Sequence, residues 1–404
     1  MANQLTKDLE IMFEEYVEGF DAACVTSSIV SKFRPSDVSM QRGGDTVYRP
    51  QDYHMSVVEG LDITAQPDTS LLQRMIPASY KQPQNIRYRL DAKEMRDPEH
   101  KKQAGKAAGL RLAAQIEKDV NTVAANQAGV VVTQTGAFDW DLAATLEARM
   151  ISRGVPMGVA RKLVLNPFDY KDVAKELGAR QYTPGIVQTA YEKAKIPDLA
   201  SFDTYRADSL ATIVGNAATG LTLGAEASFT PSAMTGDVPT DNRRMTITVS
   251  ANTMKNGDAF TIEGVDEVHM IDKVSTGQRA TFRVVSGGGT TSLVITPAII
   301  ASGPYQNVSA VGANGAAITL LNTTTAGANI AFADGALELM YGKLAFPQGQ
   351  GAQVMTATSK NGANLIMSYE FDHLAGATTC RFTTIYGATV LQPEMVGLAL
   401  AKQA

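Results

Sequence analysis

Residues 263–269, with the sequence EGVDEVH, hold the side chains of this chain that most resemble a chemical site. Carboxylate and imidazole groups gather there, at Glu263, Asp266, Glu267 and His269. On a strand, a period of two would place Glu267 and His269 on one face. Two ligands make a poor metal site, so a polar, solvent-facing strand edge is the expected structure. The alternative is a hydrolase or carbohydrate-binding protein with Glu263, Asp266 and His269 lining its site.

No other residues form a recognised catalytic pattern. The sequence has no phosphate-binding glycine loop, no GxSxG or HExxH motif and no calcium loop. Asp372 and His373 are adjacent, and neighbours on a strand point to opposite faces, so they do not suit a catalytic triad. Cys24 and Cys380 lack the spacing of a zinc site or a disulfide framework. We therefore expect no catalytic residues, no metal and no cofactor.

The charge balance argues against a protein that binds nucleic acid tightly. Lys and Arg number 36 against 41 Asp and Glu in 404 residues, a formal charge of −5. A sequence-independent DNA binder needs clustered cations to displace counterions from phosphates. Residues 284–333 carry no charged side chain, but glycine and proline interrupt them well short of the roughly 20 apolar residues of a membrane span. We expect no membrane segment.

The first twenty residues have the pattern of an amphipathic helix. Apolar residues recur at spacings of three and four from Leu5 to Phe20, and the opposite face is acidic. Glu14, Glu15 and Glu18 on that face could attract a basic helix of a partner. The pattern by itself favours a plain solvated face.

Residues 98–128 predict the longest helix, with Asp97 as its N-cap and Pro98 at its first position. Its first turns are cationic, with Lys101, Lys102, Lys106 and Arg111. These cations suggest nucleic acid, but acids interleave with them at Asp97, Glu99, Glu117 and Asp119. A solvated or inter-subunit face is the expectation.

After this helix the pattern alternates between helix and strand and then changes to period two. One helix is predicted within 138–154, with Asp139 as its N-cap and Gly154 past its end, and another at 168–178. A buried strand is predicted at 160–167 between them, and helix-turn material at 185–195. Between about 221 and 327, six short alternating runs predict a small barrel or sandwich. Within it, Asn256-Gly257 is a hairpin signal between two alternating runs. Because α/β patterns flank this β-module, we expect it to be an insertion.

Several segments, in their order along the chain, resemble one protein family. They are SMQR at 39–42 with TVYRP at 46–50, LDAKEMRD at 90–97, LNPFDYK at 165–171, MTITVSANTMKNGDAFTIEGV at 245–265 and CRFTTIYGATVLQPEMVGLAL at 380–400. The chain thereby resembles the major capsid (coat) protein of enterobacterial podoviruses, which are short-tailed phages.

The resemblance implies an α+β fold, the Hong Kong ninety-seven-like capsid fold with an inserted six-stranded antiparallel β-barrel. The implied parts are an N-terminal arm at 1–42, an E-loop at 43–88, a P-domain with the long spine helix at 89–134 completed by 372–404, an A-domain at 135–220 completed by 328–371, and the barrel at 221–327 with a D-loop at 230–244.

The resemblance also implies a function without catalysis. The coat subunit would assemble with a scaffolding protein into an icosahedral procapsid of hexamers and pentamers, with a portal protein at one vertex. The procapsid would mature into the virion shell around double-stranded DNA, which is enclosed without specific recognition. Assembly would take place in the host cytoplasm, with no membrane involved.

The implied contact residues lie in two places. Glu14, Glu15 and Glu18 would receive a basic helix of the scaffolding protein, which favours docking over a solvated face. D-loop residues would form ion pairs between capsomers, and the candidates are Asp237, Asp241, Arg243 and Arg244.

Overall fold

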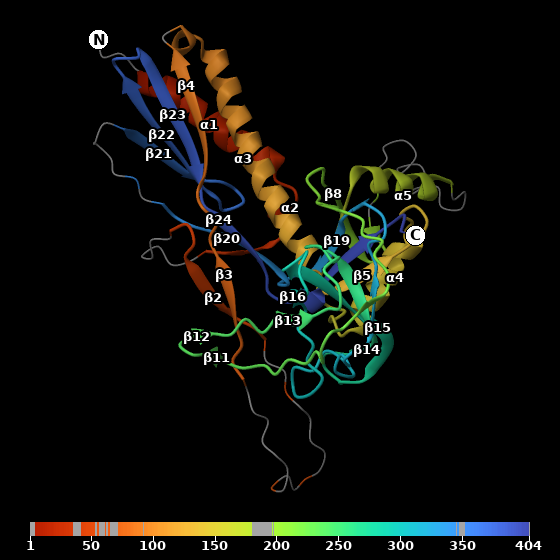
Figure 1. Ribbon diagram of the computed structural model, residues 1–404. Coiled ribbons are helices and arrows are strands. Elements are labelled where there is room, and N and C mark those ends of the chain that lie inside the picture. The colour runs from red at the N-terminus through yellow and green to blue at the C-terminus, as the bar shows by residue number, and fades with distance from the viewer. Residues whose placement is uncertain are drawn as a thin grey trace. The chain divides into compact units, whose positions relative to one another are not determined.

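A computed structural model describes residues 5–34, 42–52, 55, 61, 64, 72–91, 93–179, 196, 198–344, 346 and 352–403 (Figure 1). The chain forms two compact units. Unit 1 comprises residues 1–47, 78–120 and 338–389, and unit 2 comprises residues 48–77, 121–337 and 390–404. In the described residues no helix combines the length and the apolar character needed to cross a membrane.

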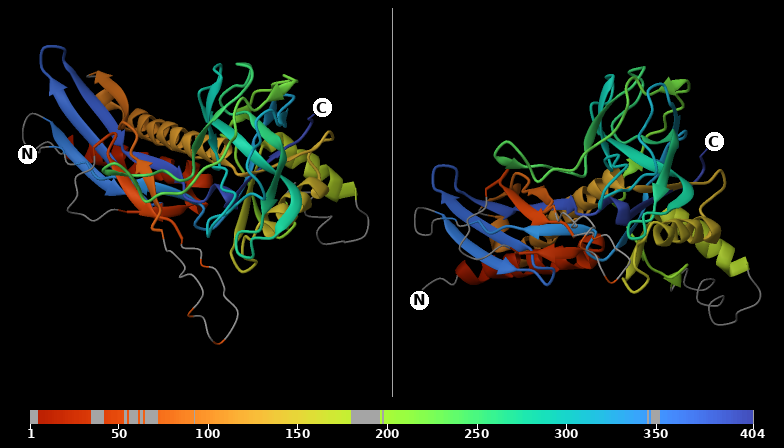
Figure 2. Two further views of the ribbon diagram at one scale, coloured as in Figure 1. Left: turned by 60° about the horizontal axis from the view of Figure 1, so that its bottom comes forward. Right: turned by 90° about the horizontal axis from the view of Figure 1, so that it is seen from below.

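Unit 1 is built on a four-stranded antiparallel sheet. Its strands are, in spatial order, β21 (Gln353–Thr358), β22 (Asn364–Asp372), β23 (Ala377–Thr384) and β4 (Gln84–Asp91). Helix α1 (Leu5–Ala23) packs on one face, where the rings of Tyr16 and Phe382 lie 4.8 Å apart (Figure 2). Alternate residues of β4, including Arg87, are exposed, and so is Arg381, which pairs with Arg87 from β23.

The predicted long helix is confirmed as α3 (Pro98–Gln127). The side chain of Asp97 caps it by accepting a hydrogen bond from the backbone N–H of Glu99 at 3.0 Å. Helices α1 and α3 touch through glycine. A Cβ atom at Gly105 would lie 2.2 Å from the carbonyl oxygen of Met12, so only glycine permits this approach.

Short elements complete unit 1. They are α2 (Thr26–Ile29), the 3₁₀ helix η1 (Glu94–Arg96) and a three-stranded sheet in which β20 (Leu337–Tyr341) lies between β1 (Ser31–Phe33) and β24 (Tyr386–Val390). Strands β2 (Thr46–Pro50) and β3 (Met75–Ser79) form a two-stranded pair within the expected E-loop. Most of the residues that connect β2 to β3 lie outside the described residues.

Unit 2 contains a mixed six-stranded sheet. Its order is β5 (Val130–Thr133), β25 (Val396–Leu400), β19 (Asn329–Ala333), β6 (Arg161–Leu165), β8 (Phe202–Arg206) and β7 (Asp198–Leu199). The predicted helices are confirmed as α4 (Trp140–Ser152) and α5 (Pro167–Ala179), and the side chain of Asp139 caps α4. Apolar residues of α4 and α5 join the sheet in one core. The helix-turn material predicted at 185–195 lies outside the described residues.

A second six-stranded sheet of unit 2 is wholly antiparallel between neighbours. Its order is β10 (Leu221–Thr222), β17 (Ala317–Leu320), β14 (Ala259–Val268), β15 (Ser275–Ser286), β16 (Ser292–Thr296) and β13 (Met245–Thr248). An isolated bridge between Leu223 and Val249 joins the segments that follow the two edge strands. The side chains enclosed by this sheet form one apolar core.

The pairing predicted from Asn256-Gly257 is wrong. A turn does form there, with Gly257 at a φ of +89°. The strands on either side pair elsewhere, because β13 pairs with β16 while β14 pairs with β15 and β17. The backbone N–H of Gly257 donates to the carbonyl of Val284 on β15. The turn signal is local, whereas the partner of each strand is decided by residues farther along the chain.

The expected division of the C-terminal third also differs from the structure. Residues 353–371 were expected with the A-domain, but β21 and β22 pair in sequence with β23 and β4 in unit 1. Residues 390–404 were expected with the spine helix, but β25 lies between β5 and β19 in unit 2. A strand's own pattern does not encode the sheet it joins, so the sequence left this choice open.

The remaining short elements of unit 2 are two antiparallel two-stranded pairs and one turn of 3₁₀ helix. They are β9 (Thr212–Ile213) with β18 (Ala326–Gly327), β11 (Met234–Thr235) with β12 (Val238–Pro239), and η2 (Pro393–Met395).

Candidate functional site

The residues that suggested chemistry do not meet in a reactive site. Glu263 is exposed, and the Asp266 carboxylate pairs with Arg279 at 3.1 Å. The Nδ1 atom of His269 lies 3.6 Å from the carboxylate of Asp272, on the exposed turn after β14. Among the described residues, no group of three His, Cys, Asp or Glu side chains could hold a metal ion.

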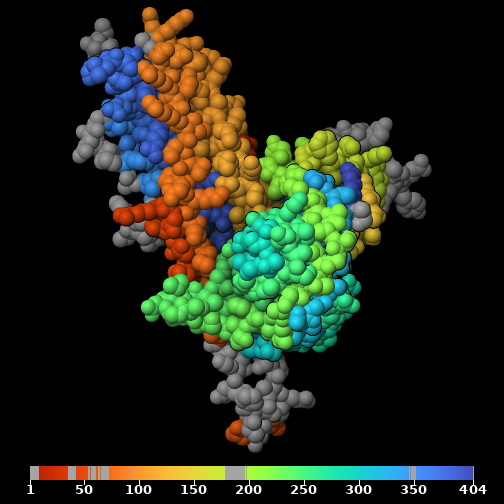
Figure 3. Space-filling view, viewed as in Figure 1, coloured from red at the N-terminus to blue at the C-terminus, as the bar shows by residue number. Residues whose placement is uncertain are grey.

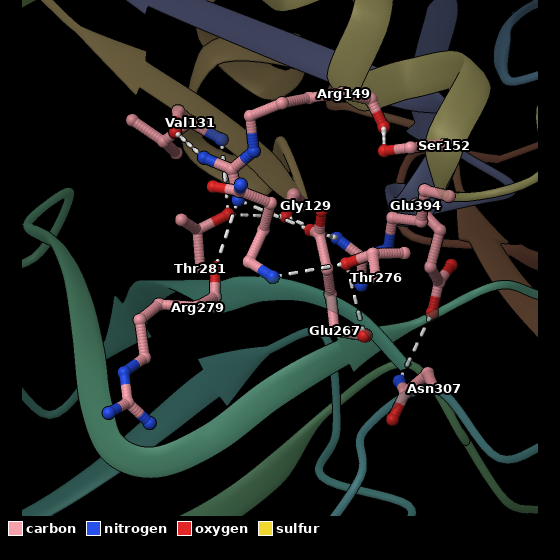
Figure 4. A network of polar contacts seen from close by, with 12 residues as sticks. Gly129, Val131, Arg149, Ser152, Glu267, Thr276, Arg279, Thr281, Asn307 and Glu394 are labelled. Atoms are coloured by element: carbon pink, nitrogen blue, oxygen red, sulfur yellow. Dashed lines mark hydrogen bonds and ion pairs between the residues drawn. The ribbon is translucent and has the colours of Figure 1, made fainter. Parts of the chain in front are cut away.

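The expectation of a polar, solvent-facing strand edge is wrong for Glu267. Its side chain is fully buried, and its Oε2 lies 3.2 Å from Nη2 of Arg149 and 4.0 Å from Nη1 of Arg153 (Figure 4). The pairing of β14 with β15 shifts register on both sides of Asp266. These irregularities interrupt the period of two, so position alone did not predict which way Glu267 points.

The two arginines extend this contact into a buried polar network between α4, β5 and strands β14 and β15 of the antiparallel six-stranded sheet. Arg149 donates to the carbonyl of Val131 at 2.8 Å, and Arg153 donates to the carbonyl of Gly129 at 2.7 Å. Thr281 of β15 donates to the same Gly129 carbonyl at 2.8 Å and accepts from the N–H of Val131 at 3.0 Å (Figure 4). The antiparallel sheet is therefore attached to α4 and β5 by directional bonds with little access to water, which favours one fixed orientation.

The acidic face of α1 borders a groove. Glu14 and Glu18 are exposed four residues apart, and Asp21 continues their line. Together with Phe13, Val17, Ala22, Ala357 and Lys360 they line a hollow of about 650 Å³. The floor is apolar and the rim along α1 carries carboxylates. Glu15 does not line the groove, because adjacent residues of a helix point about 100° apart.

Two carboxylates of α3 are turned into unit 1. Glu117 is 2% exposed, and it accepts hydrogen bonds from the N–H groups of Val25, Thr26 and Ser27. Asp119 accepts from the hydroxyl of Tyr386 and lies 2.9 Å from Nζ of Lys81. Burial and the bond to Asp119 both raise the pKa of Tyr386, which therefore stays a protonated donor. Both acids thus serve internal contacts.

The expected D-loop contains the β11–β12 hairpin, which projects from unit 2 as a green protrusion in Figure 3. Asp237 is exposed at its turn. Asp241 accepts two bonds from Arg243, both of 2.8 Å, and lies 3.8 Å from Nε of Arg244. Burial works against ionisation of Asp241, but these arginine contacts hold its pKa below the usual value.

Arg243 fixes the base of this hairpin inside unit 2. Its side chain is 4% exposed and donates to the carbonyl oxygens of Val390 and Pro77. Of the sequence-predicted ion-pair residues, the structure thus brings Asp241, Arg243 and Arg244 together and leaves Asp237 apart at the tip.

Sequence reasoning missed the residues that do most of this work, namely Arg149, Arg153 and Thr281 in the network and Ala357 and Lys360 at the groove. Glu117 was noticed only as a surface charge. One signal was present, because Glu117 comes four residues after Ala113 and three before Val120, both buried apolar residues of α3.

Nearly the whole chain matches a known protein family. The sequence model of the family described as "P22 coat protein - gene protein 5" matches residues 1–401. Among solved structures, the chain is similar to the CUS-3 coat protein I-domain, with 43% identity over 26% of this chain and 97% of that chain and a TM-score of 0.23. It is also similar to the capsid of the cyanophage P-SCSP1u, with 10% identity, coverage of 95% and 89% and a TM-score of 0.48. A third similar structure is that of Mycobacterium phage Che8, with 12% identity over 89% of this chain and 88% of that chain and a TM-score of 0.45.

Proposed function

Because the chain belongs to the P22 coat protein family, it is a major capsid protein, and we propose that it builds its shell with a scaffolding protein docked in the groove beside α1. Many copies of the chain form the icosahedral shell, and the protein resides in the virion. It is not an enzyme, and the family assignment replaces the alternative of a hydrolase or carbohydrate-binding protein. The α+β fold expected from the resemblance is confirmed.

The observation that carries the docking proposal is the chemistry of the groove. Its floor includes Phe13 and Val17, and its rim includes Glu14 and Glu18. An amphipathic helix with lysine or arginine residues beside its apolar stripe fits both features at once. Residues four apart on such a helix are neighbours, so two of its cations can meet the two glutamates, which are themselves four apart.

The contribution of charge makes the docking sensitive to salt. Exposed carboxylates steer a basic partner toward the groove, and ions screen that attraction over a Debye length of about 8 Å at physiological ionic strength. Burial of the apolar floor is not screened in this way. We expect scaffold-dependent assembly to weaken, but not to vanish, as salt rises.

The test compares glutamates on and off the groove. The double variant Glu14→Lys with Glu18→Lys reverses both charges and should abolish assembly with the purified scaffolding protein. Light scattering and electron microscopy measure the assembly. Glu15→Lys is the matched control, with the charge changed on the same helix but outside the groove, and should assemble much more like the wild type. Unchanged assembly of the double variant at every salt concentration would rule out docking in this groove.

For the D-loop we propose contacts between capsomers through Asp237 and Arg244, with the Asp241–Arg243 pair holding the loop base. Asp237 is exposed at the hairpin turn, and Arg244 keeps 34% of its side chain exposed. Exposed ion pairs are individually weak, at roughly 0.2–1 kcal/mol, but a shell repeats them many times. Asp237→Lys shells should dissociate at lower urea than wild-type shells, while the free subunit unfolds as before. Equal shell stability would contradict the contact.

We also propose the remaining expectations of the resemblance. Residues 221–327 serve as an inserted β-barrel, and the shell forms in the host cytoplasm as a procapsid of hexamers and pentamers. A portal protein occupies one vertex, and the mature shell encloses double-stranded DNA. Electron micrographs of particles from infected cells would test these points together, since a shell without capsomers of both kinds or without DNA would contradict them.

A further inference from the structure

The groove beside α1 is not acidic along its whole length. Glu14 and Glu18 form the rim at one end, and Asp21 lies three residues beyond Glu18. There the backbone N–H of Lys360 donates to Oδ2 of Asp21 at 3.2 Å. Lys360 comes from the turn between β21 and β22, and its exposed side chain lines the groove as well. The negative rim therefore gives way to a cation where the groove ends.

Two more cations lie beside the same turn. Nζ of Lys32 donates to Oδ1 of Asn361, the residue after Lys360, at 3.5 Å. The guanidinium of Arg34 lies so close to Gly362 that a Cβ atom there would collide with it. Both side chains are exposed. We call Lys32, Arg34 and Lys360 the basic cluster.

The basic cluster has little compensating negative charge of its own. Among the described residues, none of its three side chains forms an ion pair with a carboxylate. Partial burial lowers the pKa of Lys32, and the neighbouring cation Arg34 lowers it further, although two other neighbours act in the opposite direction. Three cations and the single carboxylate of Asp21 leave this end of the groove positive. The rim at Glu14 and Glu18 has the opposite sign.

We propose that the basic cluster binds carboxylate side chains of the helix that docks in the groove, so that this partner helix is basic at one end and acidic at the other. The inference rests on the proposed function, because it concerns the same docking groove. A helix with cations throughout would satisfy Glu14 and Glu18 but would be repelled by Lys360. A helix with glutamates beyond its cations meets opposite charge at both ends.

This arrangement fixes the direction of the docked helix. An apolar floor with an acidic rim alone would accept a basic helix in either direction. Opposite charges at the two ends make one direction attractive and the other repulsive. Asp21 lies roughly 4.5 Å beyond Glu18 along α1, and the basic cluster borders it, so the acidic residues of the partner helix belong within about two turns of its cations.

The test uses full-length subunits before assembly and two fluorescent helical peptides. Both peptides carry the same apolar stripe and two lysines four residues apart. Two glutamates lie within the two turns that follow the lysines in one peptide, and within the two turns that precede them in the other. The peptides thus have the same composition and net charge, and fluorescence anisotropy gives the Kd of each.

The variant of the basic cluster combines Lys32→Gln, Arg34→Gln and Lys360→Gln. The ratio of the two Kd values should change by about threefold to tenfold between the wild type and this variant, which is the effect expected of two or three exposed ion pairs. Comparing ratios cancels any difference in helix content between the free peptides, since that difference is the same for both proteins.

A matched control removes three exposed cations of unit 1 that do not line the groove. It combines Arg87→Gln, Arg89→Gln and Arg381→Gln and has the same net charge as the variant of the basic cluster. This control should keep the wild-type ratio of the two Kd values. Circular dichroism melts show whether each variant is folded.

The outcomes separate the alternatives. An unchanged ratio in the variant of the basic cluster would overturn the inference. An equal change in the control would overturn it too, because net charge alone would then govern binding. If neither peptide bound the wild type, or if Glu14→Lys with Glu18→Lys left binding intact, docking in the groove would itself be refuted. That failure of the proposed function is therefore distinguishable from a failure of this inference.

Discussion

The carboxylate of Glu117 accepts the backbone N–H of Thr26 at 2.8 Å, although 91 positions separate the two residues in sequence. The same carboxylate also binds the N–H groups of Val25 and Ser27. One buried side chain of α3 thereby satisfies the backbone donors where the chain turns out of α1 into α2, and it anchors α1 on α3.

Replacing this acceptor should destabilise the subunit. Glu117→Gln keeps the shape but turns an amide N–H₂ toward backbone N–H groups, leaving a buried donor unsatisfied at a cost of about 1–3 kcal/mol. Urea denaturation of the free subunit measures the change. Glu99→Gln is the control, because Glu99 is exposed on the same helix, and should change stability by less than about 0.5 kcal/mol. A similar small change at Glu117 would show that the three bonds contribute little.

Gly105→Ala tests whether helix propensity or packing dominates at the crossing of α1 and α3. Propensity alone predicts a gain of about 1 kcal/mol for alanine in a helix. A Cβ atom there would sit 2.2 Å from the Met12 carbonyl oxygen, and overpacking of that kind costs about 1–3 kcal/mol. We expect a net loss of stability and a lower thermal midpoint.

Gly158→Ala is the matched control for this substitution. No atom lies within 4 Å of a Cβ built at Gly158, so alanine should be neutral or slightly stabilising there. If Gly105→Ala were as stable as Gly158→Ala, the helices would not be in glycine-mediated contact.

Removing the acid of the buried network should weaken the attachment of the antiparallel six-stranded sheet to α4. Glu267→Gln leaves Arg149 and Arg153 without their carboxylate, and breaking a buried pair typically costs about 3–5 kcal/mol. Asp266→Asn breaks the more exposed pair with Arg279 and should cost less than about 1 kcal/mol.

A double-mutant cycle assigns this effect to the pair. Combining Glu267→Gln with Arg149→Met should restore part of the loss, because the arginine charge is then no longer buried without its partner. Strictly additive losses in denaturation experiments would locate the effect elsewhere.

Lys273 should make stability depend on pH in the alkaline range. Burial, with a further contribution from nearby Arg74, lowers the pKa of Lys273 to about 8, while Glu394 acts in the opposite direction. In the unfolded chain a lysine has a pKa of about 10.4. Between these values the unfolded state binds more protons, so this residue makes the free energy of unfolding rise with pH from about 8 to 10.4.

The Lys273→Met variant isolates that contribution. The free energy of unfolding of the wild type minus that of the variant should increase as pH rises from 7.5 to 10. Below pH 7.5 this difference should stay constant. Comparison with the variant is needed because burial raises the pKa of Cys380 to about 11, which lowers stability over part of the same range. Lys402→Met serves as the control, since Lys402 shares a positive φ but keeps 60% of its side chain exposed. A pH-independent difference for Lys273 would contradict the prediction.

Features that a few neighbouring residues encode could be predicted from the amino-acid sequence. Asp97 and Asp139 cap α3 and α4 as predicted, because an N-cap needs only its own side chain and the first turn of the helix. The apolar period of α1 and the alternation of the β-module likewise depend on spacing alone. The order of several short segments along the chain indicated the capsid family before any contact was known.

The pairing of the strands and the burial of particular charges could not be predicted without the folded structure. β13 pairs with β16 and not with β14, the partner expected across the Asn256-Gly257 turn. β22 joins the sheet of β4. Glu117, Glu267 and Lys101 turn inward, whereas Glu14 and Glu18 stay exposed. These outcomes depend on partners far away in sequence, because burying a charge or closing a sheet is favourable only when a complementary group arrives from another part of the chain.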